Sequence, residues 1–153
     1  MSRSGYSDDY DDHGALNRWR ANVDRAIAGK RGQAFLREMA SALDAMPVKE
    51  LIAEDIVRDS EHVCAMGAVA LARKLDVSKL DVDDPGTVAD TFGIARALAC
   101  EIAYENDENA PLYAPGPPGP AGEWTRLTPE TPAQRWQRMR KWVDACLKQD
   151  LPA

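Results

Sequence analysis

The stretch CAMGAVALARKL, residues 64–75, contains no charged side chain before Arg73. A helix that is apolar on all sides lies inside a protein, because none of its faces gains by contact with water. The small side chains of its alanines and its glycine also permit close approach of neighbouring elements. We therefore expect this stretch to form the central helix of the molecule, and Cys64 to be an inert thiol in the core.

Amphipathic patterns on both sides of this stretch predict the helices that surround it. Apolar residues recur at three- and four-residue steps over residues 16–27, 35–46 and 136–147, which is the pattern of a helix with one buried face. A short glycine-containing connection joins the first two segments and favours an antiparallel pair. Residues 131–134, Thr-Pro-Ala-Gln, are typical of a capping box at the start of the last helix.

Residues 48–63 fit two interpretations, a strand pair or a further helical turn. The apolar run 51–57, followed by the polar residues 58–61, favours a two-stranded hairpin, which is stable only when it packs on a helix. The sequence therefore predicts a mainly α fold. We expect a compact multi-helix single domain, with one small β-hairpin as the preferred interpretation of residues 48–63.

Four segments of distinct composition predict the organisation of the chain. Residues 1–13 are polar and acidic and are expected to form a mobile arm. The helical patterns place a helical core at residues 14–110. Residues 111–122 contain five of the ten prolines and are expected to form a stiff linker. The last segment, residues 123–150, is then a C-terminal amphipathic helix packed on the core.

The composition of the 153-residue chain excludes several classes of protein. Its length fits one domain, and no apolar run approaches the ~18 residues of a membrane span. The three cysteines lie far apart and are odd in number, which argues against a disulfide framework or a zinc ribbon and for a reducing compartment. The N-terminus lacks an apolar signal core. We therefore expect a cytoplasmic protein that contacts no membrane and binds no metal or cofactor.

The charge of the chain is unevenly distributed. The whole sequence has a net charge of −6, and residues 51–110 carry five basic and thirteen acidic side chains, a difference of −8. Such a region repels phosphate groups at long range, so nucleic acid is not an expected partner. The four aspartates of residues 76–84 do not follow the pattern of a calcium loop and are expected to lie in a solvated loop.

Residues 87–102 have the spacing of a DNA-binding helix-turn-helix, with Ala89 four residues before a turn glycine, Gly93. In that motif the second helix enters the major groove, and its exposed side chains contact bases and phosphates. Arg96 is the candidate DNA-binding residue, but the same helix carries two glutamates, which repel a polyanion. We therefore prefer a core helix pair with a glycine corner, and we keep a DNA-binding regulator as the alternative function.

The sequence YENDE, residues 104–108, ends that helix with three carboxylates in five residues. Carboxylates near the C-terminus of a helix oppose its dipole, so they do not stabilise the helix itself. Acid–base catalysis by paired carboxylates needs a matching nucleophile, and the sequence shows none. A surface for a basic partner is the preferred interpretation, and its candidate partner-binding residues are Tyr104, Glu105, Asp107 and Glu108.

An enzyme is the second alternative. His62 lies two residues before Cys64, so the two would share one face of a strand and could act as base and nucleophile. No third group that would orient the histidine is evident in the sequence. We therefore name no catalytic residue and expect a protein that is not an enzyme.

A resemblance covers most of the chain and rests on the stretches SRSGYSDD (2–9), GKRGQAFLRE (29–38), VCAMGAV (63–69), YENDE (104–108) and ETP (130–132) with RW (135–136) and WV (142–143). Together they resemble a family of small uncharacterised phage and prophage proteins of proteobacteria. The resemblance implies a bacterial cytoplasm and a mobile-element context, and it implies no activity and no catalytic residue. Small phage accessory proteins often bind and block a host macromolecule, including CRISPR and other defence complexes. The expected function is therefore a non-catalytic, anti-CRISPR-like accessory protein whose partner is a host protein or protein complex.

Overall fold

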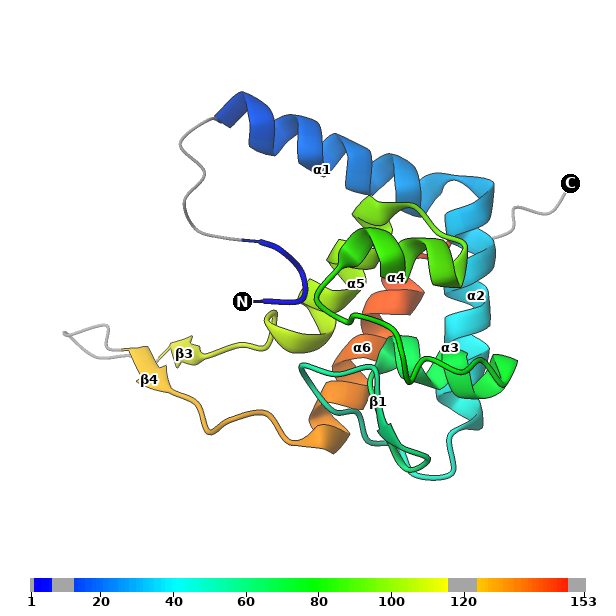
Figure 1. Ribbon diagram of the computed structural model, residues 1–153. Coiled ribbons are helices and arrows are strands. Elements are labelled where there is room, and N and C mark those ends of the chain that lie inside the picture. The colour runs from blue at the N-terminus through cyan, green and yellow to red at the C-terminus, as the bar shows by residue number, and fades with distance from the viewer. Residues whose placement is uncertain (1, 7–12, 116–123, 149–153) are drawn as a thin grey trace, which may run out of the picture.

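The computed structural model describes residues 2–6, 13–115 and 124–148 (Figure 1). The helices within these residues are α1 (His13–Ala28), α2 (Lys30–Ala45), α3 (Ala65–Arg73), α4 (Pro85–Phe92), α5 (Arg96–Asp107) and α6 (Pro132–Cys146). The strands within them form two antiparallel pairs, β1 (Val57–Asp59) with β2 (His62–Val63) and β3 (Tyr113–Pro115) with β4 (Trp124–Arg126). The prediction of a mainly α fold is confirmed.

The first two turns of α3 lie in the core, as the apolar sequence predicts, whereas Leu71 and Ala72 in its last turn are exposed. Its first six residues, Ala65–Ala70, are buried, and the helix packs on α2, on α5 and on strand β2. Gly67 permits this packing, because a Cβ atom there would lie 2.0 Å from the carbonyl oxygen of Ile56 and 2.7 Å from the Cβ of Val63. Any larger residue at position 67 would force α3 away from the chain that precedes it.

Helices α1 and α2 meet at a corner, and the antiparallel pair expected from their short connection is not formed (Figure 1). The corner is tight, because a Cβ atom at Gly32 would lie 1.8 Å from the carbonyl oxygen of Ala26. Beyond the corner, α1 packs on α5, while α2 packs on α3 and α6. The two helices therefore cover different parts of the core, and α1 helps to enclose α5.

Residues 48–63 contain the expected hairpin, but its strands are short. β1 and β2 pair with an irregularity in their register. The residues before them, 51–56, follow an irregular path in which Leu51, Ile52 and Ile56 are nevertheless buried in the core. This apolar run therefore contributes to the core and does not lengthen a strand.

Helix α6 packs on α2 through its apolar face, where Met139 and Val143 are fully buried. The predicted capping box is present at its start. Oγ1 of Thr131 accepts the backbone N–H of Gln134 at 3.2 Å, and the side-chain oxygen of Gln134 accepts the N–H of Thr131 at 2.9 Å. Two of the N–H groups that every helix start leaves unpaired are thereby satisfied.

In the described part of the expected linker, residues 111–122, residues 113–115 form strand β3. This strand pairs in register with β4, and the two project away from the helices (Figure 1). The N–H of Leu127 extends the pairing by donating to the carbonyl oxygen of Leu112 at 2.9 Å. The rest of the segment, from residue 116 onward, lies outside the described residues.

Candidate functional site

The C-terminal end of α5, which carries the sequence YENDE, is the candidate site. The chain enters α5 from Gly93, whose φ of 73° ends α4 in the left-handed conformation that glycine adopts without strain. Helices α1, α3, α4 and α6 pack around α5, so that Leu98 and Ile102 are fully buried. This packing on several sides fixes the position of the carboxylates in the last turn.

Asn106 anchors this end of α5, although its side chain is fully buried. Its amide nitrogen donates to the carbonyl oxygen of Ile52 at 2.9 Å and to Oδ1 of Asp107 at 2.8 Å. Its Oδ1 accepts the backbone N–H of Ala65, the first residue of α3, at 3.1 Å. One amide group thus satisfies buried backbone groups of two other segments, as a buried polar side chain must.

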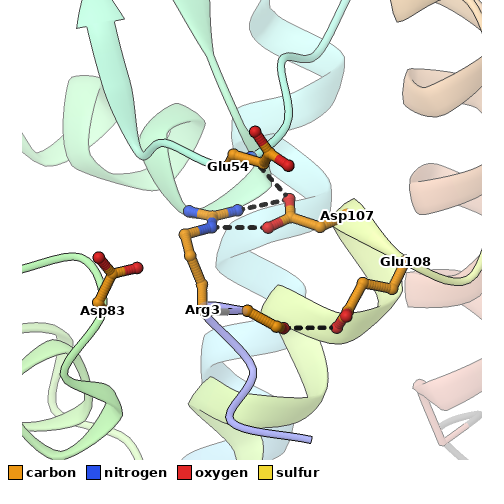
Figure 2. A pocket seen from close by; sticks show the side chains of 6 residues that line it. Arg3, Glu54, Asp83, Asp107 and Glu108 are labelled. Atoms are coloured by element: carbon orange, nitrogen blue, oxygen red, sulfur yellow. Dashed lines mark hydrogen bonds and ion pairs between the residues drawn. The ribbon is translucent and has the colours of Figure 1, made fainter. Parts of the chain in front are cut away.

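The N-terminal segment, residues 2–6, docks on this end of α5. Figure 2 shows Arg3 reaching from the segment to Asp107. Its Nε and Nη2 donate to the two carboxylate oxygens of Asp107 at 2.7 Å each, and the pair is buried, with side-chain exposures of 5% and 7%. The third nitrogen, Nη1, lies 3.7 Å from Sγ of Cys64. A bidentate pair of this kind is among the strongest and most directional contacts available to a guanidinium.

Serine hydroxyls on both sides of Arg3 bind the next carboxylate, that of Glu108. Oγ of Ser2 donates to its Oε2 at 2.8 Å and Oγ of Ser4 donates to the same atom at 2.7 Å. The N–H of Gly5 donates to the carbonyl oxygen of Ser2 at 3.1 Å, which closes the segment into a turn with a φ of 72° at Gly5. Three consecutive side chains of the segment therefore bind two neighbouring carboxylates: Arg3 binds Asp107, and the serines on either side of it bind Glu108.

Tyr6 completes the docked segment by packing between aromatic rings of α1 and α5. Its ring centroid lies 5.2 Å from that of Tyr104 and 6.0 Å from that of Trp19, edge-on to the latter. Its hydroxyl accepts the indole N–H of Trp19 at 2.9 Å and donates to Oε1 of Glu101 at 3.3 Å. The buried carboxylate of Glu101 also pairs with Arg20 at 2.6 Å, so its charge is balanced.

The ionisation of these groups follows from their surroundings. Burial disfavours the charge of Arg3, but the neighbouring Cys64 sulfur and Asp107 carboxylate outweigh it and raise the pKa of the guanidinium. Burial also disfavours the charge of Asp107, but the hydrogen bond and charge of Arg3 hold its pKa below the usual value. Burial raises the pKa of Tyr6 and the pKa of Glu105. The Arg3–Asp107 pair is therefore ionised at neutral pH.

A polar cavity of about 510 Å³ opens beside the docked segment (Figure 2). Its carboxylates come from three places in the chain and outnumber its one cation, Arg3. Because of this excess of negative charge, the cavity favours positively charged groups. Its lining consists of Ser2, Arg3, Glu54, Asp83, Asp107 and Glu108.

Three of the four predicted partner-binding residues, Tyr104, Asp107 and Glu108, contact the docked segment. Glu105 does not, since it is 9% exposed and its Oε2 accepts the side-chain amide of Asn109 at 2.8 Å. Glu105 and the side chain of Asp107 are thus largely covered, whereas a freely exposed acidic surface was expected. The acidic residues do lie together at the end of α5, but the chain's own residues 2–6 cover part of them.

The expectation of a mobile arm over residues 1–13 does not hold for residues 2–6, where Arg3 is 6% and Ser4 is 1% exposed. Helix α1 already includes His13, and residues 7–12 lie outside the described residues. Sequence reasoning missed the docking because its partners lie about a hundred positions apart. One signal could have found it: Arg3 is the one lysine or arginine among residues 1–17, and no lysine or arginine lies between Arg96 and Arg126 to pair with the carboxylates of YENDE.

The corner between α4 and α5 has the outline of a helix-turn-helix, but its second helix is not free. Arg96 is exposed at the start of α5, whereas residues 98–102 are all buried. A helix that neighbouring helices cover cannot enter the major groove of DNA. The interpretation of this stretch as a core helix pair with a glycine corner is confirmed.

His62 and Cys64 do not form a catalytic pair. The side chain of His62 is 53% exposed, and its Nδ1 lies 2.8 Å from Oδ1 of Asp59. Cys64 is 1% exposed, and its sulfur contacts Arg3. His62 is therefore not placed to act as a general base for a nucleophile in this pair. Within the part of the chain that the structure describes, no group of three His, Cys, Asp or Glu residues is placed to hold a metal ion.

Comparisons with known proteins assign the chain to no family. The resemblance to phage and prophage proteins stays a prediction, and no described helix has the length and apolar character needed to cross a bilayer. The contacts between the docked segment and α5 are therefore the basis for a functional proposal. No family model, no curated protein and no solved structure matches the chain.

Proposed function

We propose that the protein is a non-catalytic accessory protein of a phage or prophage that binds and blocks a host protein or protein complex, such as a bacterial defence complex. The observation that supports a binding role is the contact between Asp107 and Arg3. A buried carboxylate at the end of α5 holds a guanidinium through two hydrogen bonds of 2.7 Å. The phage context rests on the resemblance of the sequence alone.

The chemistry at the end of α5 suits an arginine-bearing protein segment. A planar guanidinium meets both oxygens of Asp107 at once, which an ammonium group cannot do. Glu108 accepts small hydroxyl groups beside the arginine, and the ring of Tyr104 packs on an aromatic side chain three residues after it. The carboxylates of the adjoining cavity repel phosphate, so this surface favours a basic protein over a nucleic acid.

The two alternative functions have less support. A helix-turn-helix regulator needs an exposed second helix, and residues 98–102 of α5 are buried. An enzyme that uses His62 and Cys64 needs both groups in one accessible site, and Cys64 is 1% exposed. Neither alternative uses the acidic end of α5.

Capture of host proteins during phage infection tests the proposal. The tagged wild-type chain is compared with Glu108→Lys, which reverses a charge on the exposed rim of the site, and with Asp76→Lys, which reverses a charge in an exposed loop. We expect the wild type and Asp76→Lys to retain a host partner, identified by mass spectrometry, that Glu108→Lys loses, because the new lysine repels an incoming guanidinium.

Equal capture of that partner by all three chains would contradict a role for this site. Circular dichroism and the unfolding midpoint of each variant establish that a loss of capture does not reflect a loss of folding. The Asp76→Lys variant has the same change in net charge as Glu108→Lys, so it separates a specific repulsion from a general effect of charge.

A further inference from the structure

The docked segment, residues 2–6, has the contacts of a bound ligand. Within the described residues, its hydrogen bonds to the rest of the chain are made by side chains, those of Ser2, Arg3, Ser4 and Tyr6. The backbone–backbone hydrogen bond that the segment makes, from Gly5 to Ser2, is internal. Departure of the segment would therefore break no helix and no strand.

We propose that this segment is an intramolecular competitor: it occupies the position that an arginine-bearing segment of a partner takes, so a partner binds only after it leaves. The inference rests on the proposed function, to which it adds a regulation of the same site. The two occupants share one requirement, a guanidinium for Asp107, and the site has room for one such group between Asp107 and Cys64.

The site favours exchange of one guanidinium for another over simple opening. With Arg3 in place, the side chain of Asp107 is 7% exposed and its carboxylate has both oxygens paired. Loss of Arg3 leaves this carboxylate near the other acidic groups of α5 with no cation beside it, and an unpaired charge in such a place is unfavourable. An incoming arginine restores the pair, whereas an uncharged segment does not.

The tether gives the chain's own segment an advantage. Residues 7–12 connect it to α1, and a short connection sets a local concentration on the order of millimolar. A free segment with the same contacts therefore competes poorly, and the affinity of any partner is reduced by the fraction of molecules whose site is closed. Contacts with Glu54 and Asp83, which line the adjoining cavity and which Arg3 does not bond, are available to a longer basic segment.

A peptide-binding experiment on the full chain tests this inference. The probe is the fluorescently labelled peptide Ser-Arg-Ser-Gly-Tyr, and the readout is its anisotropy. We expect the Arg3→Ala chain to bind the probe at least about tenfold more tightly than the wild type, because its own segment no longer fills the site. A peptide with alanine in place of arginine should bind neither chain. Adding Asp107→Asn to Arg3→Ala should abolish binding, while adding the matched change Asp76→Asn should not.

The thiol of Cys64 reports on docking without any partner. It is 1% exposed and in contact with Arg3. Maleimide labelling, located by mass spectrometry, should be faster at Cys64 in Arg3→Ala than in the wild type, and the probe peptide should slow it again. Cys146, on α6, is the internal control in the same digest and should be labelled equally in both chains.

Two outcomes would overturn the inference. One is equal binding of the probe by the wild type and Arg3→Ala; the other is no binding by Arg3→Ala although Cys64 labelling shows that the segment has left. Failure of the proposed function has a different signature, in which the probe behaves as expected but Arg3→Ala captures no more host protein than the wild type. If Arg3→Ala does not fold, Arg3→Lys takes its place with the same expectations. Lysine keeps the positive charge but cannot make the two parallel hydrogen bonds of the guanidinium.

Discussion

Two acidic stretches of this chain, residues 104–108 and residues 76–84, have similar composition and opposite surroundings. In the first, Asn106 is fully buried and the side chain of Asp107 is covered by Arg3. In the second, all four aspartates are exposed. The number of acidic residues therefore does not tell whether a stretch faces water or forms a packed contact.

The difference lies in where the hydrogen-bond donors come from. In the exposed stretch the donors are local, as where Asp81 accepts the N–H of Asp83 at 3.0 Å. At the end of α5, Asp107 accepts one local bond, from the side chain of Asn106, and its other donors are distant: the side chain of Arg3 and the backbone N–H of Glu54. The stretch whose observed donors are local lies in water, and the stretch that also has donors from distant segments is part of the fold.

The largest effect that separates the two stretches is expected from Asn106→Ala. The buried amide bonds the carbonyl oxygen of Ile52 and the N–H of Ala65, and both would be left without a partner in the core. Each unpaired buried group costs about 1–3 kcal/mol, so we expect a loss of about 3 kcal/mol in the free energy of unfolding, measured by urea denaturation. The matched change Asp76→Asn, in the exposed stretch, should leave the midpoint unchanged. A comparable loss in both variants would contradict the contrast.

The sequence predicts those contacts whose partners are close in the chain. The capping box at Thr131 follows from a pattern of four residues, and it is present. The buried helix α3 follows from its apolar run. For the end of α5 the sequence predicts an acidic cluster in need of a cation, but no local pattern connects it to Arg3.

The corner at Gly29 could not be predicted for a related reason. The sequence indicates a short glycine connection, which is compatible with several angles between α1 and α2. The observed angle depends on the approach of Gly32 to the carbonyl oxygen of Ala26, and on the packing of α1 against α5, which lies far away in the sequence. Contacts of this kind are set by the folded core and leave no periodic signal.

The next largest effect on the free energy of unfolding is expected from variants of the Arg3–Asp107 ion pair. Breaking a buried ion pair strands the remaining charge, but Arg3 lies on a segment that can leave and expose its charge to water, which limits the loss. We expect Arg3→Ala and Asp107→Asn each to lower the free energy of unfolding by about 1–2 kcal/mol, and the double variant to lose little more, a coupling energy of about 1 kcal/mol. Additive losses in this double-mutant cycle would show that the two side chains act independently.

Lowering the pH should remove the stability that the Arg3–Asp107 ion pair contributes. Because Arg3 lowers the pKa of Asp107, the charged carboxylate stabilises the folded chain above the usual aspartate pKa of about 4, and this stability is lost as the pH falls through the lowered value. The unfolding midpoints of the wild type and Asp107→Asn should therefore differ at neutral pH and converge in acid. A difference that stays constant with pH would mean that the charge of Asp107 contributes nothing.

A smaller effect is expected within the exposed stretch, at Asp84. Its Oδ1 accepts the N–H groups of Gly86 and Thr87 at 3.1 and 3.3 Å, which caps the start of α4. Asp84→Ala should lower the thermal midpoint, but less than either variant of the Arg3–Asp107 pair, because α4 keeps its packing on α5. Asp84→Asn, which is also a good cap, should behave like the wild type. If Asp84→Asn lost as much as Asp84→Ala, the charge and not the cap would be responsible.

The smallest effect, and one of opposite sign, is expected at Glu105, the member of the acidic cluster that the docked segment does not touch. Burial raises the pKa of this carboxyl, so the folded chain favours its neutral form; its contribution to stability is present below the usual glutamate pKa and is lost as the pH rises through the raised value. Glu105→Gln keeps an acceptor for the amide of Asn109 and removes the charge. It should raise the free energy of unfolding at neutral pH by about 0.5 kcal/mol, and the gain should vanish in acid.

The same change three residues later gives the matched control for Glu105→Gln. Glu108 is exposed, and its carboxylate accepts two serine hydroxyls of the docked segment. Glu108→Gln weakens these charge-assisted bonds, so it should lower stability or leave it unchanged. Opposite signs for the two variants, measured by urea denaturation at neutral pH, would show that the cluster consists of two kinds of carboxylate, one that burial opposes and one that the N-terminal segment uses. A loss in both variants would mean that Asn109 needs the charge of Glu105, and burial would not be the dominant influence on that group.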